Sequence, residues 1–290
     1  MKILLIGRTG QLGSSILAER TNHTIIAPAR SELDIESMAS CERAIDGSCP
    51  DVVINTAAFH NVPQCEIEPL KAFDVNCIAI RNLAAICAKR NVRLITFSTD
   101  YVFGGEKRTP YREDDRTGPL QIYGISRLAG EFSALAMAPD HATIIRTCGL
   151  YGLSGANSKG GNFVDKRIAD AKTIKKLEMG SDQVVSPTHA GDLAKAVLQM
   201  IEHPQLTPGI YHLVNEGECT WFEFTRAIYE LMELDTSVTP VDRGGRSGEM
   251  RRPRYSALAN VKVRELGIVM PHWRNALERY LDDKYGLHNT

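Results

Sequence analysis

Short apolar runs alternate with amphipathic stretches through the first half of the chain. Uninterrupted runs of β-forming residues are typical of strands that a parallel sheet buries on both faces, whereas apolar residues spaced three and four apart are typical of helices. The pattern predicts strands at 2–6, 24–29, 51–58 and 93–97, and helices at 14–19, 36–45 and 69–89. This alternation predicts an α/β fold built on a doubly wound parallel sheet.

The pattern is less regular after about residue 150. We expect helices at 162–173, 191–201, 221–232 and 273–280, and strands at 182–188 and 211–215. The aromatic residues of the last two helices, which begin at Trp221 and Trp273, fit a core better than a ligand site. The later chain therefore predicts a smaller second lobe, with a return to the main sheet at about 185–215.

Composition supports a globular protein and excludes some partners. The 290 residues are 43% hydrophobic, and 34 basic side chains oppose 35 acidic ones, which offers no electrostatic footprint for nucleic acid or an anionic membrane. The four apolar residues before Gly7 are too few for a signal peptide, so we expect a cytoplasmic protein. Seven cysteines without a CxxC pair indicate reduced thiols, and we assign no metal ligands.

Three glycines spaced three apart separate the first predicted strand from the first predicted helix. Glycine lets the backbone approach a pyrophosphate, and the free N–H groups of the helix N-terminus then hold the anion. The loop therefore predicts a nucleotide cofactor. Its expected contacts are Gly7, Thr9, Gly10, Gln11, Leu12 and Gly13.

The end of the second strand indicates which cofactor this is. Proteins that prefer NAD place an acid there for the ribose 2′-hydroxyl, but this chain has Arg30, which together with Arg8 matches the 2′-phosphate of NADP. We expect NADPH, with NADH as the alternative. Asp34 and Ile35 are expected near the adenine, unless Asp34 only caps the next helix.

Small and polar residues follow the third and fourth strands, at the sheet edge where ligands of open α/β sheets bind. Thr56, Ala57 and Ala58 would let a cofactor lie close to the third strand. After the fourth strand the chain changes abruptly to Ser98 and Thr99, whose hydroxyls suit a carbonyl oxygen. This edge predicts a carbonyl-reducing site.

Tyr123 and Arg127 lie four residues apart, and therefore on one face of a predicted helix. A fixed cation favours the phenolate, which makes the tyrosine a better proton donor near neutral pH. The pair is thus a candidate acid beside the Thr99 edge.

Through several motifs the chain resembles the extended short-chain dehydrogenase/reductases, and among them the dTDP-4-dehydrorhamnose reductase family. The resemblance runs almost from end to end. Besides the glycine loop it includes Ser98-Thr-Asp-Tyr-Val-Phe103, Tyr123-Gly-Ile-Ser126, Leu128-Ala-Gly-Glu131, Gly161-Asn-Phe-Val164 and Arg252-Pro-Arg-Tyr-Ser256.

The resemblance implies a Rossmann sheet with a C-terminal substrate lobe, divided at about 1–150 and 151–290. It implies NADPH-dependent reduction of a nucleotide sugar, dTDP-4-dehydro-L-rhamnose to dTDP-L-rhamnose, in which Tyr123 protonates the C4 oxygen as the nicotinamide delivers hydride to C4. Thr99, Tyr123 and Arg127 would form the catalytic triad, and Asn76, Tyr123 and Arg127 would also contact the cofactor. The expected substrate contacts are Thr99, Asp100, Tyr101, Asn162 and Arg252.

Two departures from the family keep other functions open. Arg127 stands where the family has lysine, and Gly149 stands where it typically has a tryptophan beside the sugar. The alternatives are a reductase or epimerase of another nucleotide sugar, or a non-catalytic NADP-binding subunit similar to that of methionine adenosyltransferase. Five arginines within 242–254 indicate either an anion-binding flap or a solvated face. A homodimer and an interface Mg2+ are also left open.

Overall fold

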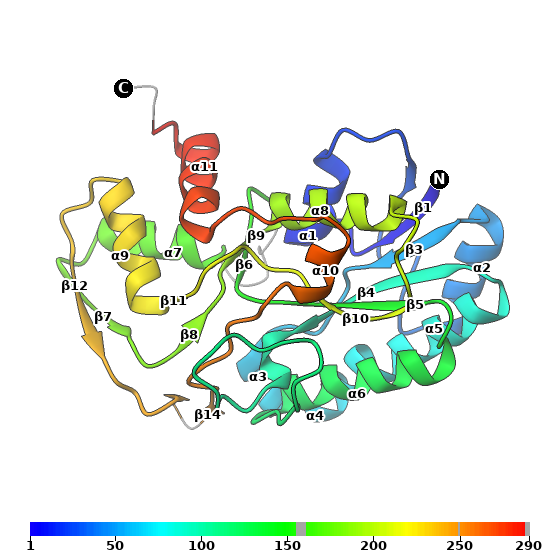
Figure 1. The fold of residues 1–290 in the computed structure, drawn as a ribbon, viewed down its shortest axis with the longest axis horizontal. Helices are drawn as coiled ribbons and strands as arrows, with labels where there is room; N and C mark the ends of the chain where they lie inside the picture. The colour runs from blue at the N-terminus through cyan, green and yellow to red at the C-terminus, as the bar shows by residue number, and fades with distance from the viewer. Residues whose placement is uncertain (155–160, 249, 288–290) are drawn as a thin grey trace.

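The computed structural model describes residues 1–154, 161–248 and 250–287. Its centre is one six-stranded sheet, in which every neighbouring pair of strands is parallel and the order is β2-β1-β3-β4-β5-β10 (Figure 1). The strands are β1 (Lys2–Ile6), β2 (Thr24–Ile26), β3 (Val52–Asn55), β4 (Arg93–Thr99), β5 (Ala142–Thr147) and β10 (Gly209–His212). The predicted doubly wound parallel sheet is confirmed.

Helices cover both faces of this sheet, which explains the uninterrupted apolar strands. In β1, Ile3 and Leu5 pack on one side, whereas Leu4 and Ile6 pack on the other. One side is covered by α1 (Gln11–Ala18), α8 (Ala190–Glu202) and α10 (Val261–Glu265). The opposite side is covered by α2 (Met38–Ser48), α5 (Ala79–Lys89) and α6 (Ile122–Met137).

A smaller lobe lies beside the sheet, at the left of Figure 1. Its core is aromatic, with Tyr151, Phe224 and Tyr280 all fully buried. It is formed by α7 (Phe163–Ala171), α9 (Trp221–Leu231) and α11 (Trp273–Tyr285), with the parallel pair β7 (Lys176–Gly180) and β12 (Ser237–Val241). The division of the chain into two domains at residue 150 stays a prediction.

Several short elements complete the fold. The remaining helical elements of the described residues are α3 (Val62–Ile67), α4 (Pro69–Phe73) and a 3₁₀-helical turn, Asp100–Val102. Three short strand pairs are β6 (Leu150–Tyr151) with β9 (Thr188–His189), β8 (Val184–Val185) with β11 (Cys219–Thr220), and β13 (Arg246–Ser247) with β14 (Met250–Arg251).

Several predicted boundaries were wrong, each for a local reason. The first helix begins at Gln11 because Gly10 is its N-cap, and β2 ends before Pro28, which has no N–H for the sheet. The strand expected at 182–188 is two short strands, β8 and β9, with Pro187 between them. The helix expected at 69–89 is continuous but contains a π-helical segment, Asp74–Ile78.

That π-helical segment packs very closely against α6. A Cβ atom on Gly130 of α6 would lie 2.1 Å from the Asn76 carbonyl oxygen, so only glycine fits there. In contrast, a Cβ on Gly47 of α2 would have no neighbour within 4 Å.

We predict that Gly130→Ala lowers the free energy of unfolding by roughly 1–3 kcal/mol, because the added methyl group forces α6 away from a backbone carbonyl. Gly47→Ala is the matched control and should raise it by about 0.5–1 kcal/mol, since alanine favours the helix. Chemical denaturation of both variants measures the difference. A Gly130→Ala protein as stable as the wild type would contradict the close packing of α6.

Candidate active site

The glycine loop closes a tight turn at the carboxyl end of β1, beside the end of β3. Gly7 has a φ of +92°, and a Cβ there would lie 2.5 Å from the Thr56 hydroxyl oxygen. A Cβ on Gly13 would lie 2.2 Å from the Gly7 carbonyl oxygen. The Thr56 hydroxyl in turn donates to the Ile6 carbonyl oxygen at 2.9 Å. The strand order of the sheet reverses between β1 and β3. Open α/β sheets bind nucleotides at such a point.

Gly10 differs from these two glycines because space around it is open. The nearest atom to a Cβ there would be the Gly7 carbonyl oxygen at 3.5 Å, and no side chain caps this end of α1. The Leu12 side chain packs into the core, so only its backbone N–H faces this end. The uncapped N–H groups beside an open glycine fit a pyrophosphate.

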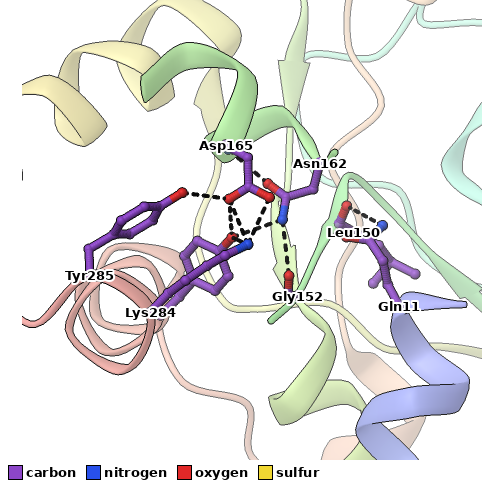
Figure 2. Close-up of polar contacts among 8 residues, drawn as sticks. Gln11, Leu150, Gly152, Asn162, Asp165, Lys284 and Tyr285 are labelled. Atoms are coloured by element: carbon purple, nitrogen blue, oxygen red, sulfur yellow. Dashed lines mark hydrogen bonds and ion pairs between the residues drawn. The ribbon is translucent and has the colours of Figure 1, made fainter. Parts of the chain in front are cut away.

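Gln11 joins the end of this loop to Leu150, the first residue of β6. Its Nε2 donates to the Leu150 carbonyl oxygen at 3.2 Å, as Figure 2 shows, while its Oε1 is buried without a partner. A buried acceptor without a partner beside the glycine loop is a further feature that suits a bound polar group.

Arg8 and Arg30, the two arginines predicted to contact the 2′-phosphate, each have a contact near the end of β2. Arg8 donates from Nη1 to the Ala27 carbonyl oxygen at 2.9 Å, which brings the glycine loop to this strand. The Arg30 side chain is 82% exposed and contacts only the Glu36 carboxylate, at 3.3 Å. Asp34 accepts from the Glu36 N–H at 3.1 Å, but the N-cap of α2 is Ser37. The alternative capping role of Asp34 was therefore wrong.

Asn76 is buried in the π-helical segment, and its amide is fully used. Its Oδ1 accepts from the Phe59 N–H at 2.9 Å, and its Nδ2 donates to the Phe59 carbonyl oxygen at 2.9 Å and to the Ser126 hydroxyl at 3.1 Å. Ser126 donates to the Tyr123 carbonyl oxygen at 2.9 Å. These contacts give Asn76 a place in holding α6, and its predicted cofactor contact stays a prediction.

The predicted triad comes together between β4 and α6. Burial raises the pKa of Tyr123, while the positive charge of Arg127 and a hydrogen bond to Thr99 lower it and the charge of Asp100 raises it. Arg127 is buried, donates from Nη2 to the Phe97 carbonyl oxygen, and keeps an Nε without a partner. The geometry suits a proton donor flanked by a hydroxyl and a fixed cation.

Asp100 and Tyr101 surround this triad in different ways. Asp100 is buried, accepts from the Thr99 hydroxyl at 3.0 Å and from the Ser256 hydroxyl at 2.6 Å, and so joins β4 to the later chain. Its carboxylate is therefore occupied by the protein. The Tyr101 ring meets the Tyr123 ring edge-on at 6.3 Å, and burial raises its pKa against the nearby charge of Arg252.

Asn162 is also occupied within the protein. It caps α7 through its Oδ1, which accepts from the Asp165 N–H at 3.0 Å. Its Nδ2 donates to the Gly152 carbonyl oxygen at 3.0 Å and to the Tyr280 hydroxyl at 2.8 Å (Figure 2). The geometry supports a structural role, and the predicted substrate contact stays untested.

A cavity of about 210 Å3 in the smaller lobe is lined in part by Trp221, which was expected in the core. The Trp221 and Phe163 rings lie 4.5 Å apart in its wall. Its other lining residues are Met179, Gly180, Gln183, Arg243, Arg246, Ser247 and Arg252. Aromatic faces beside arginines suit a base and its phosphates. A larger open hollow, of about 880 Å3, lies at the opposite edge of the sheet, away from these groups.

The family model described as the RmlD substrate binding domain matches residues 1–285. The chain belongs to this family. The spore coat polysaccharide biosynthesis protein SpsK of Bacillus subtilis is 38% identical over 98% of both chains. A dTDP-4-keto-6-deoxy-D-glucose reductase of Streptomyces niveus is 34% identical over 94% of both chains. The structure of a Bacillus anthracis dTDP-4-dehydrorhamnose reductase in complex with NADP is 31% identical, with a TM-score of 0.89 over 97% of this chain and 99% of that one.

In this RmlD-family chain, residue 149 is glycine rather than tryptophan, but the indole of Trp221 lies against it. Gly149 has a φ of +52°, and a Cβ there would lie 3.2 Å from Cη2 of Trp221 in α9. The sequence pattern could not show this contact, because it joins residues more than seventy positions apart.

Within the described residues, no group of three or more His, Cys, Asp or Glu side chains could hold a metal ion. None of the helices within 1–154, 161–248 and 250–287 is long and apolar enough to cross a membrane.

Asp100 predicts a pH dependence of stability. Burial raises its pKa in the folded state, so between its unfolded pKa of about 3.9 and its folded pKa only the folded protein binds the proton. Stability should fall in that window as pH rises, by at most about 1.4 kcal/mol per pH unit. In Asp100→Asn this part of the slope should vanish, which urea denaturation from about pH 4 upward measures. Identical slopes in the two proteins would contradict the prediction.

Proposed function

We propose that this protein uses NADPH to reduce the 4-keto group of a nucleotide sugar, and that dTDP-4-dehydro-L-rhamnose is converted to dTDP-L-rhamnose. The proposal rests mainly on one observation: Thr99, Tyr123 and Arg127 lie together at the edge of the sheet that also carries the glycine loop, where the space around Gly10 is open. Family membership supports it, because relatives named as reductases of dTDP-4-keto sugars match over nearly the whole chain.

In this proposal the nicotinamide, when bound, supplies the hydride to C4. Tyr123 donates its proton to the C4 oxygen, so that the carbonyl becomes an alcohol. The hydrogen bond to Thr99 orients the tyrosine hydroxyl, and the charge of Arg127 stabilises the phenolate that remains. The unpartnered Nε of Arg127 is available to a ribose hydroxyl.

The cavity in the smaller lobe is the proposed site of the thymidine diphosphate. Trp221 and Phe163 offer aromatic faces, and Arg243, Arg246 and Arg252 offer positive charge. The charge of Arg252 acts on Tyr101, whose ring contacts Tyr123, so this cavity adjoins the reacting edge. Residue 249 of the arginine-rich 242–254 segment lies outside the described residues.

A cytoplasmic location and a possible homodimer belong to the same proposal. No disulfide joins any of the seven cysteines, all of which lie in the described part of the chain, and this suits a reducing compartment. The net charge of −1 favours neither nucleic acid nor membrane as a partner.

We predict NADPH-dependent turnover of dTDP-4-dehydro-L-rhamnose, measured by loss of NADPH absorbance. Tyr123→Phe should bind NADPH as before and lose turnover by roughly 10²–10⁴-fold, because the proton donor is gone. Tyr211→Phe, which loses only contacts to Thr207, is the matched control and should keep the rate.

Each other outcome of this assay points to a different function. A Tyr123→Phe variant with most of the wild-type rate would mean that another group donates the proton. Turnover of only dTDP-4-keto-6-deoxy-D-glucose, as the name of the Streptomyces niveus relative indicates for that protein, would change the substrate. A wild type that binds NADPH but reduces no nucleotide sugar would favour the non-catalytic subunit.

The exposed Arg30 predicts a preference between cofactors. Arg30→Glu should weaken NADPH binding about tenfold or more, since a charge-assisted contact to the 2′-phosphate becomes repulsive, and should leave NADH binding equal or tighter. Cofactor fluorescence titration measures both constants. Arg43→Glu, the same charge change on the exposed side of α2, should alter neither. Equal wild-type affinities for NADPH and NADH would refute the assignment of Arg30.

A further inference from the structure

Three charged or ionisable residues are spaced by four along α6, namely Tyr123, Arg127 and Glu131. Side chains at this spacing lie on one face of a helix, where an arginine and a glutamate four residues apart are close enough to pair. Here that pair does not form. Among the residues that the structure describes, no carboxylate makes a salt bridge with Arg127, although both side chains of the expected pair are buried.

The Glu131 carboxylate is instead taken by Arg146 of β5. Nε of Arg146 donates to Oε1 at 2.9 Å, and Nη2 donates to Oε2 at 2.7 Å. The two side chains are only 2% and 1% exposed. This bidentate geometry uses both oxygens of Glu131 and is the strongest form of such a pair.

Arg146 is itself fixed from the other side. Its Nη1 lies 3.4 Å from the Glu113 carbonyl oxygen, and its guanidinium lies over the Phe103 ring at 5.1 Å. Nη1 also lies 3.5 Å from Nε2 of His212, whose pKa burial and the charge of Arg146 lower to about 3. His212 is therefore neutral near pH 7 and adds no charge to this cluster.

We propose that Arg146 is a positioning residue for the proton donor, because it holds the Glu131 carboxylate away from Arg127 and so leaves the charge of Arg127 unneutralised beside Tyr123. The inference rests on the proposed role of Tyr123. Without Arg146, the buried carboxylate would need another cation, and Arg127 is one helical turn away. The two charges would then cancel at the phenol.

The other groups that face Tyr123 do not replace this charge. Asp100 and Cys65 act in the opposite direction, since both raise its pKa. Thr99 contributes a hydrogen bond and Tyr101 an edge-on ring contact, and neither carries a positive charge. Arg127 is the cation that lowers the pKa of Tyr123, so its pairing state should control the proton donor.

The test follows the ionisation of Tyr123 without any substrate. The full-length protein is labelled with 3-fluorotyrosine, the signal of Tyr123 is assigned by its loss in Tyr123→Phe, and its ¹⁹F shift is followed against pH. Fluorine lowers the pKa of phenols, which moves the titration toward neutral pH. The variants are Arg146→Gln, Arg146→Gln with Glu131→Gln, and Arg90→Gln. Arg90 makes a bidentate pair with Asp46 that is more exposed and lies at the far edge of the sheet, and it is the control for removal of a paired arginine.

We expect Arg146→Gln to raise the midpoint of the Tyr123 titration by about one pH unit or more, as loss of a nearby charge predicts. The double variant should return it to the wild-type position, because no carboxylate is left to pair with Arg127. Arg90→Gln should leave it unchanged. The same curve in wild type and Arg146→Gln, or an equal upward shift in the double variant, would overturn the proposal.

Should Arg146→Gln not fold, Glu131→Gln tests the same idea from the other partner. With no carboxylate beside Arg127, the midpoint should stay or fall, and an upward shift would overturn the proposal. A positioning role also predicts that Arg146→Lys, which keeps the charge, recovers most of the wild-type midpoint. Since no substrate is used, these results stand apart from those of the turnover assay.

Discussion

The position of α6 against the sheet is the constraint on which the active site depends. This helix carries both Tyr123 and Arg127, and three separate contacts fix it. Gly130 allows it to touch the Asn76 carbonyl group, the Asn76 amide reaches Ser126, and Glu131 is paired with Arg146 of β5. A shift or rotation of α6 would break all three at once. The distance between the phenol and the β4 edge is therefore set by buried packing rather than by the mobile loops that often carry sites.

Polar contacts also join distant segments of the chain near the carboxyl edge of the sheet. Asp100 bonds Ser256 of the later chain, and Gln11 of the glycine loop bonds Leu150. A buried carboxylate costs stability as pH rises, and such costs are common where a site must be held rigid. The glycine loop and the carboxyl end of β4 are thus each tied to a later segment of the chain.

The sequence analysis predicted five of the six strands of the central sheet and missed β5 (Ala142–Thr147). Runs such as 2–6 and 93–97 reveal strands because burial on both faces leaves few polar positions, and Gly13 is explained by a contact with Gly7, six residues away. Contacts between residues that are far apart in the sequence could not be predicted. That Asn162 and Asp100 are occupied by Tyr280 and Ser256, and that Trp221 lies against Gly149, depends on packing that no local pattern encodes.

Arginine in place of the family lysine has a physical consequence that favours an active site. A guanidinium has several nitrogens in a fixed plane, so Arg127 bonds the Phe97 carbonyl oxygen through Nη2 while its Nε stays unused. It also cannot lose its proton, so its charge persists at alkaline pH, where a buried lysine would become neutral. The electrostatic requirement on Tyr123 is therefore met by arginine as well as by lysine.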